Sequence, residues 1–155
     1  LRQGYEVFAA DQDPAAVEAV RRLAPALPPE NFRVEPVEAM SFPDSSVAVA
    51  ISSAVLHFAR DDRQFDAMLR GTWRVLRPGG LFFCRLASSI GIERQIRQLA
   101  GRRYALPDGS ERYLVDEPML MNLTDQLGGQ LADPLKTTVV QNQRSMTTWV
   151  VRKNG

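Results

Sequence analysis

The sequence predicts an α/β fold with a doubly wound, mostly parallel sheet. Segments with strand and helix patterns alternate along the chain, which is typical of parallel strands joined by crossover helices. Residues 47–51 are apolar at every position, as expected for a parallel strand covered on both faces. The first strand ends at an acidic residue, Asp11, at the edge of the sheet where α/β proteins bind their ligands.

Composition narrows the class of protein. The 155 residues fit a single domain, and 45% hydrophobic and 24% charged residues are ordinary values for a globular chain. A net charge of +1 indicates neither a nucleic-acid-binding surface nor a membrane-surface patch. Cys84 is the only cysteine, which excludes an internal disulfide and a multi-cysteine metal site. No apolar run reaches the roughly 20 residues of a membrane span, so we expect a cytoplasmic protein. We expect no metal site.

The first helix has clear boundaries. We expect the opening strand at residues 5–10, after the end of an earlier helix at residues 1–4. Asp13 is a good N-cap, Pro14 suits the first helical turn, and Pro25 ends the helix. Between them, apolar residues recur at helical spacing: Val17, Val20, Leu23 and Ala24.

The middle of the chain continues this alternation. A short strand is expected at residues 32–35, and a loop at 40–46 leads into the apolar strand at 47–51. Asp61 or Asp62 caps the next helix. The buried stripe of that helix consists of Phe65, Met68, Leu69, Thr72, Trp73 and Leu76.

Proline and glycine mark the end of this helix at residues 77–80, Arg-Pro-Gly-Gly, and a strand follows at 81–86. A last helix is expected at 117–127. Strands at 136–141 and 146–151 close the chain, and because only a short polar stretch separates them we expect them to be antiparallel neighbours.

Residues 88–115 differ in character and are expected to form an insertion. Apolar residues at helical spacing, Ile92, Ile96 and Leu99, predict a helix near its start. A Glu93–Arg97 pair at i,i+4 would support that helix. The turn sequence Pro-Asp-Gly at 107–109 then predicts a hairpin.

Four segments in this order and spacing resemble the class I S-adenosylmethionine-dependent methyltransferases, small-molecule branch: Val7–Asp11, and residues 40–46, 51–58 and 74–80. The last segment, in which Leu-Arg-Pro-Gly-Gly follows a helix, is the most specific. The resemblance implies a Rossmann-like sheet with an antiparallel C-terminal strand, covering residues 1–155 as one methyltransferase-like domain. It also implies S-adenosylmethionine as cofactor, methyl transfer to a small-molecule acceptor, and an insertion that covers the substrate.

Asp11 is the strongest candidate for a cofactor-binding residue. A carboxylate accepting two charge-assisted hydrogen bonds matches the two hydroxyls of a ribose. The alternative is that Asp11 only caps the next helix, but Asp13 is better placed for that. The resemblance places Gln12 beneath the adenine.

The resemblance assigns the remaining cofactor contacts to two other strand ends. Pro36 stands where the family usually has an adenine-binding acid, so Val37 and Glu38 become the adenine candidates. Ser52 and Ser53, which follow the central strand, are candidates for the methionine end. Ordinary loop serines are the alternative.

His57 is the only histidine and is the candidate catalytic residue. Its pKa near working pH suits a general base. A structural or pocket-wall role is the alternative, because Leu56 and Phe58 flank it.

The sequence begins after the point at which the family carries its glycine-rich turn. We therefore interpret the domain as truncated at the N-terminus. We expect upstream sequence, or another chain, to supply a strand between those ending at Asp11 and Ser52. Without that turn, we expect this chain on its own to bind cofactor poorly and to be inactive.

Two other functions fit part of the pattern. A nicotinamide-dependent Rossmann oxidoreductase also places an acid at the end of its second strand. A degenerate, non-catalytic binding domain is the second alternative. We expect a small-molecule substrate and neither a nucleic-acid nor a membrane partner; the sequence favours no particular oligomeric state.

Overall fold

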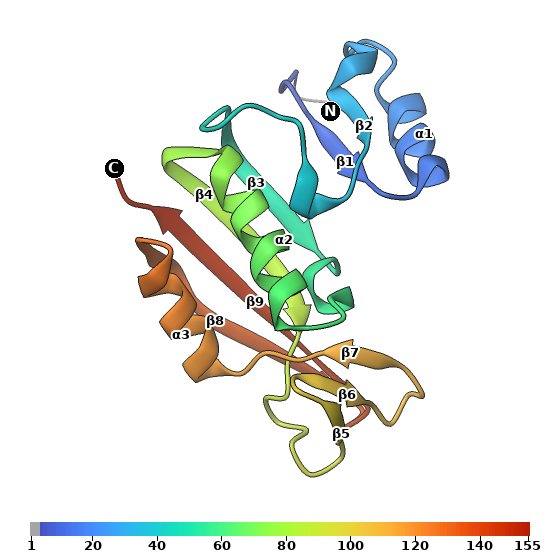
Figure 1. Cartoon of the computed structure of the whole chain (residues 1–155), viewed down its shortest axis with the longest axis vertical. Helices are drawn as coiled ribbons and strands as arrows, with labels where there is room; N and C mark the ends of the chain where they lie inside the picture. The colour runs from blue at the N-terminus through green and yellow to red at the C-terminus, as the bar shows by residue number, and fades with distance from the viewer. Residues whose placement is uncertain (1–3) are drawn as a thin grey trace. The chain divides into compact units, whose positions relative to one another are not determined.

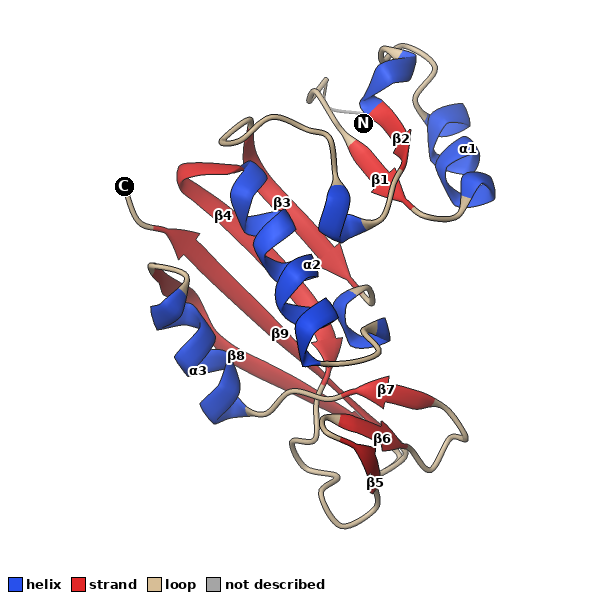
Figure 2. Cartoon of the chain, viewed as in Figure 1, coloured by secondary structure: helices blue, strands red, loops and turns tan. Residues whose placement is uncertain are grey.

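The computed structural model describes residues 4–155 and divides the chain into two compact units, Leu1–Phe42 and Pro43–Gly155. Figure 1 colours the elements in chain order, and Figure 2 colours them by type. The helix end expected at residues 1–4 falls almost wholly outside the described part. Within that part, no helix combines the length and the apolar character needed to cross a membrane.

The first unit is a small βαβ arrangement. Strands β1 (Ala9–Asp11) and β2 (Phe32–Val34) are parallel, and helix α1 (Pro14–Leu23) connects them. Short 3₁₀ helices η1 (Pro29–Asn31) and η2 (Val37–Ala39) flank β2. The core is formed by Val17, Ala24 and Phe32, with Ala9, Val20 and Leu27 against them. The opening strand is shorter than expected, but it ends at Asp11 as predicted.

The second unit contains a four-stranded mixed sheet in the order β3-β4-β9-β8. The strands are β3 (Val47–Ser53), β4 (Leu76–Ala87), β8 (Gly129–Val140) and β9 (Arg144–Lys153). β3 and β4 are parallel, whereas β9 is antiparallel to both β4 and β8. β8 therefore runs in the same direction as β3 and β4. The predicted antiparallel C-terminal strand is confirmed.

Two helices cover one face of this sheet, α2 (Asp62–Val75) and α3 (Glu117–Gln126). The Trp73 ring of α2 meets Phe82 of β4 edge-on, with ring centres 6.5 Å apart. Phe82 meets Trp149 of β9 at 5.7 Å. Trp149 Nε1–H donates to Thr124 Oγ1 of α3 at 3.0 Å. One aromatic cluster thus joins both helices to the sheet. The stripe predicted for this helix is buried, although its last residue, Leu76, begins β4.

Strand β3 differs from its prediction. The apolar run suggested a strand covered on both faces, but β3 lies at the edge of the four-stranded sheet. Val49 and Ile51 are 53% and 73% exposed. An apolar run indicates which residues favour burial without indicating what covers them. β1 and β3 belong to different sheets, so the direct pairing that would have ruled out an intervening strand is not seen; such a strand stays a prediction.

The prediction of a helix near residues 92–99 is wrong. Turns occupy its first half, and three short antiparallel strands follow: β5 (Arg97–Ala100), β6 (Arg103–Ala105) and β7 (Glu111–Tyr113). Gly91 has a positive φ of 79°, and its N–H donates to the Glu93 carboxylate at 2.9 Å. Glu93 therefore closes a local turn, while Arg97 pairs with Ala105 in the sheet. The hairpin, formed by β6 and β7, is confirmed.

The Arg-Pro-Gly-Gly sequence at 77–80 lies just after the end of α2 at Val75 and forms an irregularity within β4, which begins at Leu76. The register with β3 shifts there, from Val47 opposite Leu76 to Val49 opposite Leu81. A Cβ at Gly80 would lie 2.8 Å from the Arg77 carbonyl oxygen and 2.9 Å from that of Ala48. This position therefore requires glycine, which explains the most specific of the sequence motifs.

Candidate functional site

The first unit brings its four predicted cofactor residues to one sheet edge. β1 and β2 are parallel and in register, with Asp11 opposite Val34, so both strands end at the same edge. The Glu35 N–H donates to the Asp11 carbonyl oxygen at 3.0 Å, and η2 follows at once. The residues gathered there are Asp11, Gln12, Val37 and Glu38.

The Asp11 carboxylate is exposed and only partly engaged. Its Oδ1 accepts the Asp13 N–H at 2.9 Å, and Oδ2 has no hydrogen-bond partner within residues 4–155. Because each carboxylate oxygen has two acceptor sites, capacity for two hydroxyl donors remains. The helix cap is Asp13, whose Oδ1 accepts the Ala15 N–H at 2.9 Å. Asp11 is therefore not needed as the cap of α1.

The neighbouring acids differ in their local partners. The Glu35 carboxylate is occupied by local hydrogen bonds, because it accepts both the Ser41 N–H and the Ser41 hydroxyl, the latter at 2.6 Å. Pro36 precedes η2 and lacks an N–H. Glu38 is half-buried and is the acidic residue of η2.

In the second unit, Ser52 and Ser53 end β3 opposite Cys84 and Arg85 of β4. The Ser52 hydroxyl is buried and makes no conventional hydrogen bond to another described residue. The adjacent Cys84 thiol is a weak partner, and burial raises the pKa of Cys84 to about 12, with the Ser52 hydroxyl opposing this rise. Since buried polar atoms are normally satisfied, Ser52 is a notable exception in this sheet.

His57 lies in the 3₁₀ helix η3 (Leu56–Phe58), directly after β3, and is only 5% exposed. Its Nδ1 accepts the Ala87 N–H at 3.0 Å. His57 thus supplies an acceptor for β4 beyond the point where β3 ends. The neutral ring must then carry its proton on Nε2, which faces no hydrogen-bond partner among the residues described.

The charge state of His57 follows from its surroundings. Burial first, and then the nearby positive charges of Arg112 and Arg85, lower the pKa of His57 to about 4. At neutral pH the side chain is a hydrogen-bond donor through Nε2–H. A general base needs a free lone pair, and here the free nitrogen is the protonated one. The catalytic role stays a prediction, and this geometry disfavours it.

Sequence reasoning did not single out Arg85, and it considered Arg112 only as a residue of the insertion, without placing it near His57. The Arg112 Cζ lies 4.8 Å from the centre of the Phe58 ring, which is itself 4.6 Å from the His57 ring. Phe58 is 56% exposed. The available signal was Arg85, a charge within the otherwise apolar strand at 81–86.

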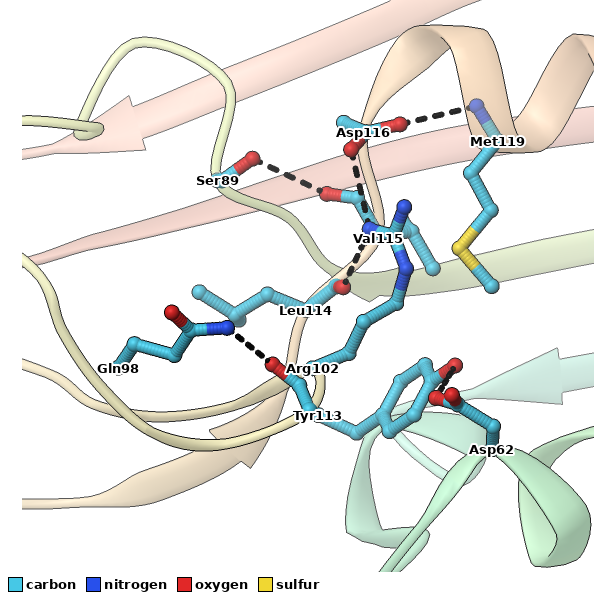
Figure 3. A network of polar contacts seen from close by, with 10 residues as sticks. Asp62, Ser89, Gln98, Arg102, Tyr113, Leu114, Val115, Asp116 and Met119 are labelled. Carbon is cyan, nitrogen blue, oxygen red and sulfur yellow. Dashed lines mark hydrogen bonds and ion pairs between the residues drawn. The ribbon is translucent and has the colours of Figure 1, made fainter.

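The insertion is fixed to both helices of the second unit (Figure 3). The Tyr113 hydroxyl donates to Asp62 Oδ1 of α2 at 2.8 Å, and its ring stacks on Phe65 at 4.5 Å. Burial, and then the Asp62 carboxylate, raise the pKa of Tyr113. Figure 3 also shows Arg102 reaching Asp116, which caps α3, at 3.0 Å. A hydrogen bond to α2 and an ion pair to the N-cap of α3 therefore hold the β-sheet of the insertion in place.

The insertion begins and ends at one place in the fold. Ser88 and Val115 form a parallel bridge, and the Ser89 N–H donates to the Val115 carbonyl oxygen at 2.9 Å. Beside this closure, Ala87, Leu106 and Leu114 form a small buried cluster. Over residues 4–155, no group of three or more His, Cys, Asp or Glu side chains is arranged to hold a metal ion.

Comparison with solved structures shows the fold. The 1,6-didemethyltoxoflavin-N1-methyltransferase of Burkholderia thailandensis, solved with 1,6-didemethyltoxoflavin and S-adenosylhomocysteine, is 20% identical and has a TM-score of 0.71. The match covers 99% of this chain but only 64% of the longer Burkholderia enzyme. An S-adenosylmethionine-dependent methyltransferase from Methanosarcina mazei is 20% identical over 98% of this chain and 84% of its own, with a TM-score of 0.76.

A third structure shows that this fold alone does not fix the reaction. The cyclase SpnF is 12% identical, covers 98% of this chain and 68% of its own, and has a TM-score of 0.68. No curated protein matches the chain significantly. Residues 1–84, more than half of the chain, match the family described as "Methyltransferase domain". The chain therefore belongs to the methyltransferase domain family and has the fold of the class I S-adenosylmethionine-dependent enzymes, as its sequence predicted.

Proposed function

We propose that this chain acts in methyl transfer from S-adenosylmethionine to a small-molecule acceptor. The observation that carries the proposal is the exposed Asp11 carboxylate at the end of β1, with η2 at the end of the adjacent strand β2. In parallel sheets this carboxyl edge is where nucleotide ligands lie. The family match over residues 1–84 supports the same function.

The residues present fit the adenosine part of this cofactor. Asp11 would accept hydrogen bonds from the two ribose hydroxyls, since Oδ2 and the second lone pair of Oδ1 remain available. Gln12 follows it in the chain and is exposed, so it is our candidate for contact with the adenine face. Val37 and Glu38 of η2 are the candidates for the adenine edge.

For the methionine end, our candidates are Ser53 and the buried Ser52 hydroxyl, which makes no conventional hydrogen bond to another described residue. When bound, S-adenosylmethionine would supply a methyl group that its sulfonium centre already activates. The task left to the protein is to hold the acceptor in line with that methyl group at about 3–3.5 Å and to exclude water. A neutral His57 that donates a hydrogen bond is better suited to holding the acceptor than to acting as a general base.

Binding of the two cofactor classes distinguishes methyl transfer from the nicotinamide-dependent alternative. We expect the intact protein to bind S-adenosylhomocysteine with a Kd of about 1–100 μM in isothermal titration calorimetry. We expect no measurable binding of NAD⁺. If NAD⁺ binds and S-adenosylhomocysteine does not, the proposed function is wrong; if neither binds, the non-catalytic alternative stands. Cytoplasmic location stays a prediction.

A further inference from the structure

Six arginines of the described chain are half-buried: Arg33, Arg74, Arg85, Arg102, Arg103 and Arg112. Four of them form ion pairs: Arg33 with Glu35, Arg74 with Asp44, Arg102 with Asp116, and Arg103 with Glu111. Arg85 and Arg112 have no carboxylate partner within residues 4–155. Arg112 donates to the carbonyl oxygen of Glu111 at 2.7 Å, and Arg85 makes no side-chain hydrogen bond in this part of the chain.

The two unpaired arginines lie around His57. Arg85 precedes Ala87 on β4 by two residues, so both side chains are on the same face of the sheet, and His57 accepts the Ala87 N–H. Arg112 lies over the Phe58 ring, which contacts the His57 ring. Both positive charges also lower the pKa of His57, after burial. Asp108 also lies in the field of Arg112 but forms no ion pair with it.

Every polar group in this cluster is a donor. Guanidinium groups donate only, and the neutral His57 ring offers Nε2–H because Nδ1 is occupied. Half-buried cations lose hydration, and an incoming anion can offset that loss. The exposed face of Phe58 adds an aromatic surface at the same place. His57 follows the carboxyl end of β3, and Arg85 lies two residues before the end of β4, at the edge of the sheet where α/β proteins bind ligands.

We propose that the methyl acceptor is an aromatic acid, whose carboxylate is bound by Arg85, Arg112 and the Nε2–H of His57. The planar guanidinium groups match a carboxylate geometrically, and the Phe58 ring would pack against the aromatic part. This inference rests on the proposed function for the identity of the reaction. The anion-binding cluster itself belongs wholly to the second unit.

The test uses benzoate as the probe and benzamide, its uncharged counterpart, as the control ligand. Because His57 is the only histidine, its ring ¹⁵N resonances identify themselves in NMR spectra of the intact protein. We expect benzoate to shift the His57 Nε2 resonance with a Kd in the millimolar range or below, and benzamide to bind at least about tenfold more weakly. No benzoate binding, or equal binding of the two ligands, overturns the inference.

Variants then locate the binding site. Arg85→Gln and Arg112→Gln should each weaken benzoate binding about tenfold or more. Arg103→Gln is the matched control, because Arg103 is half-buried on the neighbouring strand but already paired with Glu111. It should change benzoate affinity less than about twofold. If all three variants bind benzoate like the wild type, the anion lies elsewhere and the proposal is wrong.

Titration of the same variants with S-adenosylhomocysteine separates the two proposals. Unchanged affinity for S-adenosylhomocysteine together with lost benzoate binding supports both. If S-adenosylhomocysteine fails to bind while benzoate still depends on Arg85 and Arg112, the proposed function fails and the anion site stands. If S-adenosylhomocysteine binds and benzoate does not, only the aromatic acid is ruled out.

Discussion

Trp149→Ala is expected to lower the free energy of unfolding by about 3–5 kcal/mol, the usual cost of deleting a buried tryptophan. Trp149 is completely buried in β9 and contacts Phe82 edge-on at 5.7 Å. Its Nε1–H is bonded to Thr124 of α3, so the substitution also removes a link between helix and sheet. Urea denaturation followed by far-UV circular dichroism measures the loss.

A second variant keeps this prediction decisive, because a loss of this size can unfold a domain of ordinary stability. Trp149→Phe retains most of the ring but not the hydrogen bond to Thr124. We expect it to fold and to lose about 1–2 kcal/mol. Stability within about 0.5 kcal/mol of the wild type for both variants would show that the Trp149 cluster does not form the core.

Folding stability is also expected to depend on the protonation of His57. The pKa of His57 is lowered to about 4 in the folded protein from an ordinary value of 6.5. The unfolded chain therefore binds the proton more tightly. Stability from this residue is fully present above about pH 6.5, falls as the pH is lowered towards about 4, and then levels off. At about 1.4 kcal/mol per pKa unit, the total is about 3 kcal/mol.

The control for this prediction is His57→Gln, which removes the titrating group. The glutamine side-chain oxygen can still accept the Ala87 N–H that His57 accepts in the wild type. Urea titrations of both proteins at about pH 7 and about pH 4.5 give the two pH dependences. We expect the wild type to lose about 2–3 kcal/mol more than the variant over this interval. Equal losses would mean that His57 is not held neutral.

Local patterns in the sequence predicted most of the fold. Asp13 and Pro14 set the start of α1, the apolar stripe of α2 is buried, and the closing strands are antiparallel. The helix expected near residues 92–99 failed because the positive φ of Gly91 and the turn bond to Glu93 outweigh helical spacing. Three apolar residues at helical spacing are weak evidence for a helix when the same segment can also form a turn.

The site was predictable only where the order of parallel strands brings its residues together. Asp11 and η2 could be anticipated, because strand ends of a parallel sheet share one edge. The cluster of His57, Arg85 and Arg112 could not, because β7, which carries Arg112, belongs to the separate antiparallel sheet of the insertion, and no strand-order rule places that sheet beside η3 and β4. The occupied Nδ1 of His57, which turns an expected base into a donor, also depends on a tertiary contact with Ala87.

The central claim is that Asp11 binds the ribose hydroxyls. It is tested most directly by a thermodynamic cycle that combines an Asp11 variant with a ligand lacking those hydroxyls, in the intact protein. Asp11→Asn keeps an oxygen for the Asp13 N–H but removes the charge, and Glu18→Gln is an exposed control on α1. Each protein is titrated with S-adenosylhomocysteine and with its 2′,3′-dideoxy analogue. We expect Asp11→Asn to weaken S-adenosylhomocysteine binding about 10–100-fold while hardly affecting the analogue. Equal effects on both ligands, or undiminished affinity of Asp11→Asn for S-adenosylhomocysteine, would contradict the claim.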